Sequence, residues 1–536
     1  MGIITSAHGL PLHHAQGAQA GQASYCYLFP ELADRPDAGL FPATTAKETL
    51  ARLAAFERVY RQFETQTRRM QLPAAYTYFG QFMNHDMSAP VNVAGRSRSG
   101  PAATVIGSGD PPDLGLRRRP RSTAAILARI RNEQQNPLML ESLYADGPRS
   151  ADPEVRSLYE ADGVRFKLAK ATTLGRQELA AATVAPERVM HRRGAHDIPR
   201  DAARRIPLIA DRRNDENLIL SQLHLALMLL HNRAAAALKP TIPDPVERFA
   251  AARLLLTRHY HWCILHDYLP SLLSAGAVSQ ALSAPPRLSA PGGVPVEFTT
   301  AAFRFGHSMV SQLYDFNGNF GEGGRVSDAA KLHELFAFTS QGRMAPFAHA
   351  TSQLPDHWVA DWDRLTRLSG TPRGGADRID MSFAADMLNH MQHSGNLLHA
   401  SIFFRNVMRG FFRRMSFGQD FAQAYCIKPL SARQVLSAMP KTVRPAAAAA
   451  GFGRSTPAWL YFMCEADVLE GGERLGPTAS RIIADTVTGL IRHHAGTTLQ
   501  QDGRAWHPRH SVLKTQNGKP LGSLRALLLC AEEEHP

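Results

Sequence analysis

The sequence has no long apolar run and few cysteines. None of its segments approaches the 18 or more apolar residues of a transmembrane helix, so no membrane span is expected. The five cysteines are far apart, odd in number and never arranged as Cys-x-x-Cys, which argues against a disulfide framework or a zinc site. The first stretch, MGIITSAHGLPLHHAQGAQAGQ, lacks the basic segment and apolar core of a secretory signal. We therefore expect a cytoplasmic or leaderless secreted protein.

The sequence also lacks a concentrated patch of one charge. Lys and Arg number 60 against 47 Asp and Glu, for a net charge of +13, but the excess is scattered along the chain. Short basic runs at 116–122 and 190–205 lie in segments with Pro or Gly. A nucleic-acid-binding protein usually gathers its charge on one helix or stripe, so no nucleic-acid partner is predicted. Arginine can instead pair buried anions such as propionates or phosphates.

Alternating strand patterns and internal repeats are scarce, whereas apolar residues at helical spacing are common. The sequence therefore predicts a mainly α fold, with an irregular arm at 1–45 and one large domain at 46–536. Residues 88–212 are predicted to form a long connecting segment with short helices. Helices are predicted at 46–70, from Pro73 onward, and at 215–238, 244–277, 328–338, 379–393, 418–427 and 477–493.

The stretch YFGQFMNHD places two polar residues on one face of a predicted helix. Gln81 and His85 are four residues apart and share that face, whereas Asp86 points about 100° away. A single histidine on a half-apolar helix is more often a core or surface residue than a functional one. This segment alone therefore does not indicate a site.

Three further polar pairs have one-turn spacing inside apolar segments. They are Arg213 with Glu216, Arg304 with His307, and Asn406 with Arg409. Acids in a first helical turn are favoured by the helix dipole, which alone would account for Glu216. Gly306 removes a side chain next to His307 and lets a bulky group approach the backbone. Core packing does not require these pairs, and they suit a large flat ligand with anionic edges.

Together these motifs resemble the animal-type haem peroxidases of the peroxidase–cyclooxygenase superfamily, in particular a bacterial branch. The resemblance runs from about 73 to 495 and rests on motifs in the family's order. FGQFMNHDMSAP is similar to the distal-histidine motif, and FRFGHS to the proximal-histidine motif. RRNDENLILSQLHLALMLLHNR resembles the segment that holds the distal arginine. RNVMRG, with SFGQD and KPLS after it, resembles the segment behind the proximal histidine. PAWLYFMCEADVLEGGERLGPTASRIIAD resembles a carboxyl-terminal segment of the bacterial members. The resemblance implies that 46–536 is a helical catalytic domain around a central haem b.

The resemblance assigns four residues to the proximal side of the haem. His307 would ligate the iron through a neutral imidazole nitrogen. Asn406 would accept a hydrogen bond from the other ring N–H and so fix the tautomer of His307. Arg304 and Arg409 would pair with the haem propionates.

On the distal side, the resemblance assigns acid–base chemistry to His85. This residue would take a proton from hydrogen peroxide and return it to the leaving oxygen. Arg213 would stabilise the charge that develops as the O–O bond breaks, and Gln81 would hold the distal water network or a halide. The implied reaction reduces hydrogen peroxide to water and, through compound I, oxidises a small donor such as a halide or a phenol.

The sequence departs from the family pattern at the positions of covalent haem links. Asn84 stands where mammalian members have an ester-forming Asp, and Asn217 stands where one member has a sulfonium-forming Met. Glu216 keeps the other ester-forming carboxylate. The resemblance therefore implies one ester link at most, through Glu216, with a merely packed carboxylate as the alternative.

The calcium site of the family is retained only in part. Asp86 stands at the position of one ligand, but the loop 137–147, aligned on Tyr144, has Met139 and Glu141 in place of the family's Asp and Ser. Calcium requires several hard oxygen ligands. The pattern predicts an altered or lost site, with a salt bridge from Asp86 to an arginine as a substitute.

Two alternatives remain open. A fatty-acid dioxygenase of the same superfamily would carry a radical-forming Tyr three residues before the proximal His, where this chain has Arg304. Other tyrosines lie near the motifs, at Tyr76, Tyr78 and Tyr314. A non-enzymatic haem-binding protein would have lost the distal pair or the axial ligand, and this chain keeps all of them.

Overall fold

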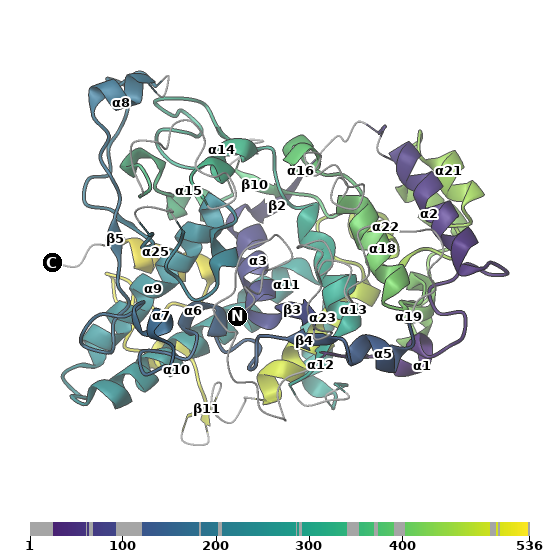
Figure 1. Ribbon diagram of the computed structural model, residues 1–536, viewed down its shortest axis with the longest axis horizontal. Helices are drawn as coiled ribbons and strands as arrows, with labels where there is room; N and C mark the ends of the chain where they lie inside the picture. Colours follow the sequence, from purple (N-terminus) through teal and green to yellow (C-terminus); the bar gives the residue numbers. More distant parts are fainter. Residues whose placement is uncertain are drawn as a thin grey trace.

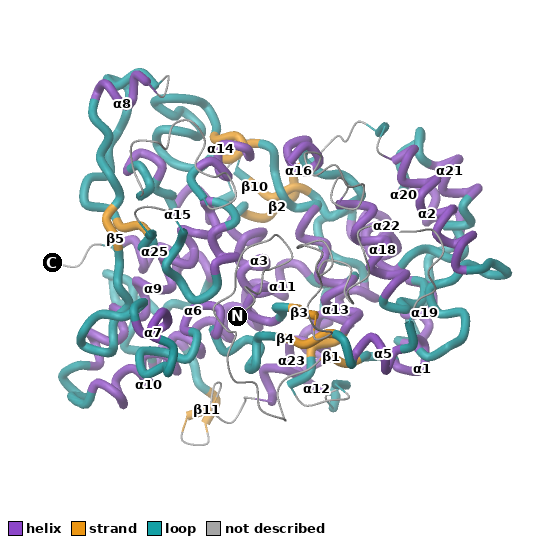
Figure 2. The backbone as a smooth tube through the Cα atoms, viewed as in Figure 1, coloured by secondary structure: helices purple, strands orange, loops and turns teal. Residues whose placement is uncertain are grey.

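The computed structural model shows a mainly helical protein in which short strands occur only as small pairs (Figures 1 and 2). This confirms the predicted fold class. The structure describes residues 25–60, 62–63, 68–92, 121–181, 184–201, 206–285, 287–288, 292–339, 353–368, 374–390, 402–493, 500–501 and 504–533. Within them, no helix is both long enough and apolar enough to cross a bilayer.

The fold combines longer helices, several of them almost wholly buried, with many shorter ones. The longer helices are α2 (Ala46–Tyr60), α3 (Ala75–Met87), α9 (Leu218–Leu238), α10 (Pro245–Cys263), α18 (Ile402–Phe412), α22 (Ala458–Glu470) and α23 (Pro477–His493). The shorter ones include α5 (Thr123–Leu127), α6 (Glu141–Tyr144), α7 (Pro153–Arg156), α8 (Arg176–Ala181), α12 (Ala277–Ser283), α14 (Leu332–Ala337), α15 (Trp362–Thr366), α16 (Ala385–His390), α19 (Gly418–Ala424), α20 (Ala432–Ala438), α21 (Arg444–Ala449) and α25 (Leu524–Glu532). The strand pairs are β1 (Tyr25–Cys26) with β7 (Val294–Pro295), β2 (Arg69–Pro73) with β10 (Gly375–Asp377), β3 (Pro90–Asn92) with β4 (Ile130–Asn132), β5 (Ala169–Lys170) with β6 (His196–Asp197), β8 (Leu313–Tyr314) with β9 (Ala330–Lys331), and β11 (Gln500–Gln501) with β12 (Arg504–Ala505).

The predicted helix at 46–70 is too long. Helix α2 ends at Tyr60, residues 64–67 lie outside the described part, and the chain then forms β2. The periodic pattern continues past Tyr60, but the β2 backbone instead pairs with β10. Helix α3 begins close to the predicted start at Pro73, and its end at Met87 is followed by extended Ser88, shortly before Pro90.

Helix α9 is the central helix and packs against α3, α10 and α25. Its amino-terminal cap is Asn217, whose side chain accepts a hydrogen bond from the N–H of Leu220 at 2.9 Å. Nearly every side chain in its first three turns is buried, so α9 has no solvent face there. This capping fixes where α9 begins, and with it the residues just before it.

The predicted helix at 244–277 is interrupted. Helix α10 continues into a π-helical turn, η2 (Ile264–Tyr268), and a short helix, α11 (Leu269–Leu272). Such turns are uncommon and re-aim side chains. Here the Tyr268 ring lies so close to α3 that a Cβ at Gly80 would be 2.1 Å from its hydroxyl oxygen. Glycine at this position allows the two helices to approach each other.

The described part of the predicted arm packs into the core. Strand β1 pairs in parallel with β7, and the N–H groups of Leu28 and Phe29 donate to the two carboxylate oxygens of Glu297, each at 2.9 Å. Glu297 belongs to α13 (Val296–Thr300), which leads directly into the 3-10 helix η3 (Ala302–His307). Glu297 therefore ties the amino-terminal segment to the element that carries His307.

We expect the substitution Glu297→Ala to destabilise the protein by about 2 kcal/mol, because it leaves two buried backbone N–H groups without an acceptor. Glu297→Gln keeps one acceptor oxygen and should destabilise it less. Chemical denaturation followed by circular dichroism measures both. An alanine variant as stable as the unsubstituted protein would show that Glu297 does not hold this segment.

Candidate functional site

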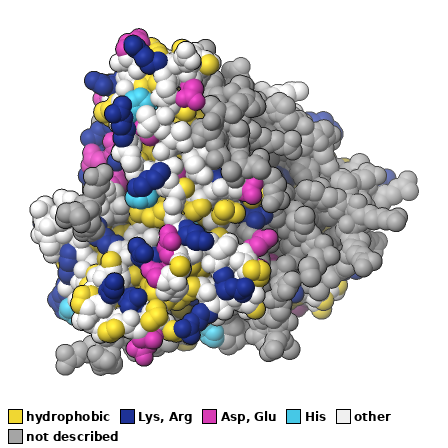
Figure 3. All heavy atoms as spheres, turned by 60° about the vertical axis from the view of Figure 1, so that its left-hand side comes forward, with side chains coloured by type: hydrophobic (Ala, Val, Ile, Leu, Met, Phe, Trp, Pro, Cys, Tyr) yellow, Lys and Arg dark blue, Asp and Glu magenta, His cyan; other side chains and the backbone are white. Residues whose placement is uncertain are grey.

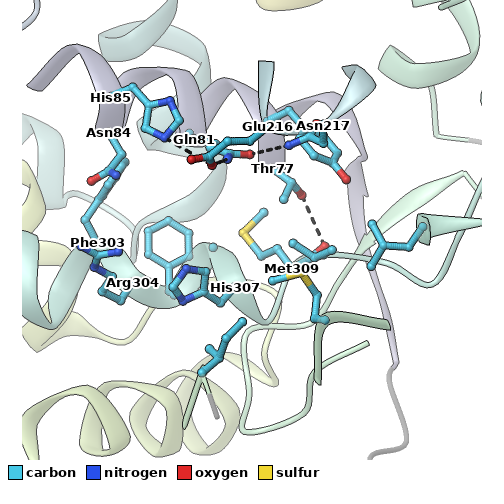
Figure 4. A pocket seen from close by; sticks show the side chains of 18 of the residues that line it. Thr77, Gln81, Asn84, His85, Glu216, Asn217, Phe303, Arg304, His307 and Met309 are labelled. Atoms are coloured by element: carbon cyan, nitrogen blue, oxygen red, sulfur yellow. Dashed lines mark hydrogen bonds and ion pairs between the residues drawn. The ribbon is translucent and has the colours of Figure 1, made fainter. Parts of the chain in front are cut away.

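Several of the predicted site residues, among them Gln81, His85 and His307, line a cavity of about 160 Å³ (Figure 4). Its walls come from α3, the start of α9, η3, α14 and α18, which are far apart in the sequence. The lining includes Thr77, Tyr78, Gln81, Asn84, His85, Glu216, Asn217, Phe303, Arg304, Gly306, His307, Met309 and Arg405. In Figure 4, His85 and His307 lie on opposite sides of the open space.

His85 is held by a hydrogen bond that the sequence did not reveal. Its Nδ1 lies 2.9 Å from Oδ1 of Asn214, an oxygen that can only accept, so Nδ1 carries the proton. The other end of the Asn214 amide donates from Nδ2 to Nδ1 of His224 at 3.0 Å. Asn214 lies in the 3-10 helix η1 (Arg212–Asp215), just before α9. His85 Nε2 therefore keeps its lone pair on the cavity side, 3.9 Å from Oε2 of Glu216.

Burial sets the protonation of both groups. Burial, with the positive charge of Arg213 adding to the shift, lowers the pKa of His85 to about 3. The same burial raises the pKa of Glu216 to about 8, although Arg213 opposes that shift. At neutral pH, His85 is therefore an uncharged base and Glu216 is largely an uncharged acid.

Gln81 bridges two other residues of the cavity wall. Its Nε2 donates to Oε2 of Glu216, and its Oε1 accepts from Nδ2 of Asn217, both at 3.0 Å. Gln81 and His85 share the cavity-facing side of α3, as their spacing predicted. The bridge orients the Glu216 carboxyl beside His85.

Arg213 does not lie where the resemblance implied. Its guanidinium pairs with Asp211 and donates to the backbone oxygens of Ser88 and His85, at 2.8 and 2.9 Å. It is absent from the described residues that line the cavity. The adjacent acid Asp211 holds the side chain back against the end of α3. Arg213 therefore fixes the backbone of His85 and contributes its charge from behind.

His307 projects from η3 with Asn406 of α18 beside it. The amide nitrogen of Asn406 lies 3.4 Å from Nδ1 of His307, so the predicted pair is in contact. In this orientation the amide donates; a half-turn of the amide presents its oxygen to a protonated Nδ1 and leaves Nε2 as a ligand atom. Burial lowers the pKa of His307 well below its usual value, and the neighbouring arginines lower it further. A Cβ at Gly306 would meet no atom within 4 Å, which agrees with open space beside this turn.

Three arginines, Arg304, Arg405 and Arg409, cluster beside His307, and Arg413 lies close enough to act on Arg304 and Arg409. Burial lowers the pKa of Arg304 and of Arg405 to about 10, and repulsion between these cations adds to the effect. The pKa of Arg409 is lowered well below its usual value and that of Arg413 is lowered, in both cases mainly by burial. Arg405, one turn before Arg409, lines the cavity itself, although the sequence analysis did not single it out. Its spacing of four residues from Arg409 was the available signal.

Asp86 is turned away from the cavity, as its position on α3 predicted. Its carboxylate accepts from the N–H groups of Leu140 and Ser142 and from the Ser142 hydroxyl, at 3.0 to 3.1 Å. These partners are backbone groups and a hydroxyl, whereas the substitute that we expected was an arginine. Among the described residues, no group of three or more His, Cys, Asp or Glu side chains is arranged to hold a metal ion.

The residues around the cavity fit a haem. A neutral imidazole with an amide behind it can ligate iron, and a second neutral imidazole faces it. The clustered cations repel one another, so propionate groups would relieve that repulsion. Nε of Arg413 is buried without a hydrogen-bond partner among the described residues. Glu216 is the one acidic residue in the described lining and thus the one carboxyl there for an ester.

Comparisons with known proteins agree with this fit. Residues 154–410 match the family model for animal haem peroxidase, a range that includes His307 and Asn406 but not His85. The chain is 26% identical over 285 residues to the mouse peroxidasin homolog and over 316 residues to the human one. Those matches cover 45% and 51% of this chain, but only 18% and 20% of the relatives' length.

Solved structures share the fold. Peroxidase A from Dictyostelium discoideum superimposes with a TM-score of 0.55 at 15% identity, covering 98% of this chain and 99% of its own. A fatty acid alpha-dioxygenase from Oryza sativa superimposes with a TM-score of 0.53 at 12% identity, covering 92% and 82%. The family match supports the peroxidase–cyclooxygenase superfamily, and these structures show that the fold is shared.

We expect Asn214→Asp to raise the pKa of His85 by roughly one to two pH units, because a carboxylate at Nδ1 favours the imidazolium. Nuclear magnetic resonance of labelled histidine measures this titration. Asn214→Ser, which keeps a neutral acceptor, is the control and should leave the pKa near its original value. An unchanged His85 titration in the Asp variant would contradict the contact.

Proposed function

We propose that this chain, whose comparisons support the peroxidase–cyclooxygenase superfamily, is a haem-dependent peroxidase. It reduces hydrogen peroxide to water and oxidises a small donor such as a phenol or a halide. The observation that carries the proposal is the pair of neutral histidines on opposite sides of one cavity, with a cluster of buried arginines beside one of them. One histidine can ligate a metal and the other can move a proton.

The proposed cofactor is haem b, held at His307. When bound, it supplies the iron at which peroxide is reduced and the donor is oxidised. Asn406 holds the ring of His307, and Arg304 and Arg405 line the cavity where they can pair with the propionates. Arg409 lies one turn further along α18, behind Arg405, and adds positive charge to the same edge.

His85 is the proposed acid–base residue. Because Asn214 fixes the proton on Nδ1, the lone pair of Nε2 can accept a proton from hydrogen peroxide. The imidazolium so formed is a strong acid, since the pKa of His85 is held to about 3, and it returns the proton to the departing oxygen. The uncharged form of His85 persists through the neutral pH range.

Gln81 and Arg213 act on this chemistry as positioning groups. Gln81 holds the Glu216 carboxyl near His85, and its amide lines the space that peroxide would occupy. Arg213 clamps the backbone of His85 and disfavours its protonated form. In this proposal the charge of Arg213 acts through His85, because its guanidinium is already engaged by Asp211.

The two histidines should give separable defects. We expect His307→Ala to lose the Soret absorbance of bound haem, because the axial ligand is gone. His85→Ala should keep the Soret band but react with hydrogen peroxide roughly 10²- to 10⁴-fold more slowly in stopped-flow measurements. Retention of both haem and peroxide reactivity by His307→Ala would disprove the ligand assignment.

The same fold occurs in fatty-acid dioxygenases, and Tyr78 lines the cavity and donates to the hydroxyl of Tyr314 at 2.6 Å. We nevertheless expect peroxide-dependent oxidation of guaiacol and no palmitate-dependent uptake of oxygen, because Arg304 stands three residues before His307. Tyr78→Phe should retain peroxidase activity within about twofold, with Tyr314→Phe as its matched control. Oxygen uptake with palmitate that is lost in Tyr78→Phe would replace the peroxidase assignment.

A further inference from the structure

A second and larger cavity lies on the other side of α9. It has a volume of about 920 Å³ and is bounded by the β5–β6 pair, α9, α15 and α25. Cavities of this size hold small organic ligands. None of its lining residues takes part in the chemistry proposed for the central cavity. The face turned forward in Figure 3 shows basic side chains around apolar patches.

The floor of this second cavity is apolar. Leu225, Ala226 and Leu229 form one face of α9, and Val359 and Trp362 lie near the start of α15. An aromatic or aliphatic body can cover such a surface and remove it from water. The floor alone would admit any apolar molecule.

One buried hydrogen-bond donor in this lining has no acceptor among the described residues. Gln222 is only 3% exposed, and its Oε1 accepts from the N–H of Ala360 at 3.4 Å. Its Nε2 is buried and has no hydrogen-bond partner among the described residues. A buried amide N–H without an acceptor is unfavourable, and such groups are rare in folded proteins. A ligand in the cavity with an acceptor oxygen near Nε2 of Gln222 would satisfy this group.

The charges around the second cavity are unbalanced. Arg192 pairs with Glu532 at 3.6 Å, and Arg233 pairs with Glu533 at 3.1 Å. Lys170 donates to the backbone oxygen of Gly194 and to His196, both at 2.9 Å. In the part of the chain that the structure describes, no carboxylate pairs with Lys170 or Arg193. The lining thus carries an excess of positive charge.

We propose that the second cavity binds an amphipathic organic anion. Its apolar body covers the α9 face, an acceptor oxygen takes the hydrogen bond from Nε2 of Gln222, and its negative charge is favoured by Lys170 and Arg193. Sulfonates, carboxylates and phosphates share this chemistry. The site is independent of haem, because it lies behind α9 and uses none of the residues assigned to the central cavity.

Calorimetry on the whole chain, with and without added haem, tests the proposal with 8-anilino-1-naphthalenesulfonate as the probe. N-phenyl-1-naphthylamine, the same molecule without the sulfonate, is the matched neutral ligand. We expect the anion to bind at one site. Gln222→Met should weaken that binding roughly tenfold, the loss of one hydrogen bond to a charged group. Arg193→Ser should weaken it about threefold.

Arg433→Ser is the control variant, because Arg433 is an exposed arginine on α20 and its loss changes the net charge equally. It should bind the anion as the unsubstituted protein does. Equal binding of the charged and neutral ligands would overturn the role of the cations. Anion binding that is absent, or unchanged in both Gln222→Met and Arg193→Ser, would overturn the site. Peroxidase activity does not enter either outcome, so the two proposals fail separately.

Discussion

The arrangement of the central cavity depends on one constraint, the burial of positive charge beside His307. Arg405 and Arg409 are buried, Arg304 is partly buried at the cavity wall, and repulsion from neighbouring arginines adds to the burial that lowers the pKa of each. Burying cations together is unfavourable unless negative charge compensates them. An anionic group at the cavity would relieve the repulsion within this cluster. Burial, together with the same positive field, lowers the pKa of His307 and keeps it uncharged, which is the state a metal ligand needs.

On the opposite wall of the cavity, buried hydrogen bonds hold His85 and Glu216 in fixed orientations. The oxygen of Asn214 sets the tautomer of His85, while Gln81 fixes the Glu216 carboxyl next to it. Arg213 anchors the backbone at the end of α3, so the ring of His85 is positioned from both its side chain and its main chain. Each of these groups is fixed before substrate arrives. Preorganisation of this kind reduces the reorganisation needed during proton transfer.

The sequence predicted helices well where periodicity and local signals agreed. The predicted helix at 477–493 is confirmed by α23, and most of 215–238 by α9, which starts after its Asn217 cap. The helix predictions failed where tertiary contacts override periodicity, as at the strand pairing of β2 and the π-helical turn that ends at Tyr268.

The same distinction holds for the central site. Helical spacing was enough to place Gln81 and His85 on one face. Contacts between segments decide which way Arg213 points, and the acid that turns it, Asp211, was not considered with it. Asn214 was missed because its partner His85 is distant in sequence, whereas Arg405 was overlooked although its spacing from Arg409 was a local signal.

The fold itself does not settle the chemistry, because the structures that share it include both a peroxidase and dioxygenases. What distinguishes the activities must therefore lie in the side chains of the wall, where Arg304 occupies the place that a radical-forming tyrosine would need.

Helix α9 shows how one element can serve two sites. Its cap, Asn217, belongs to the central cavity, whereas Gln222 and Leu229, further along the helix, line the second cavity. Because the first three turns of α9 are buried on all sides, a shift of this helix is passed on to the residues packed around it. An occupant of the second cavity would therefore act on the central cavity through the position of α9 and the residues at its start.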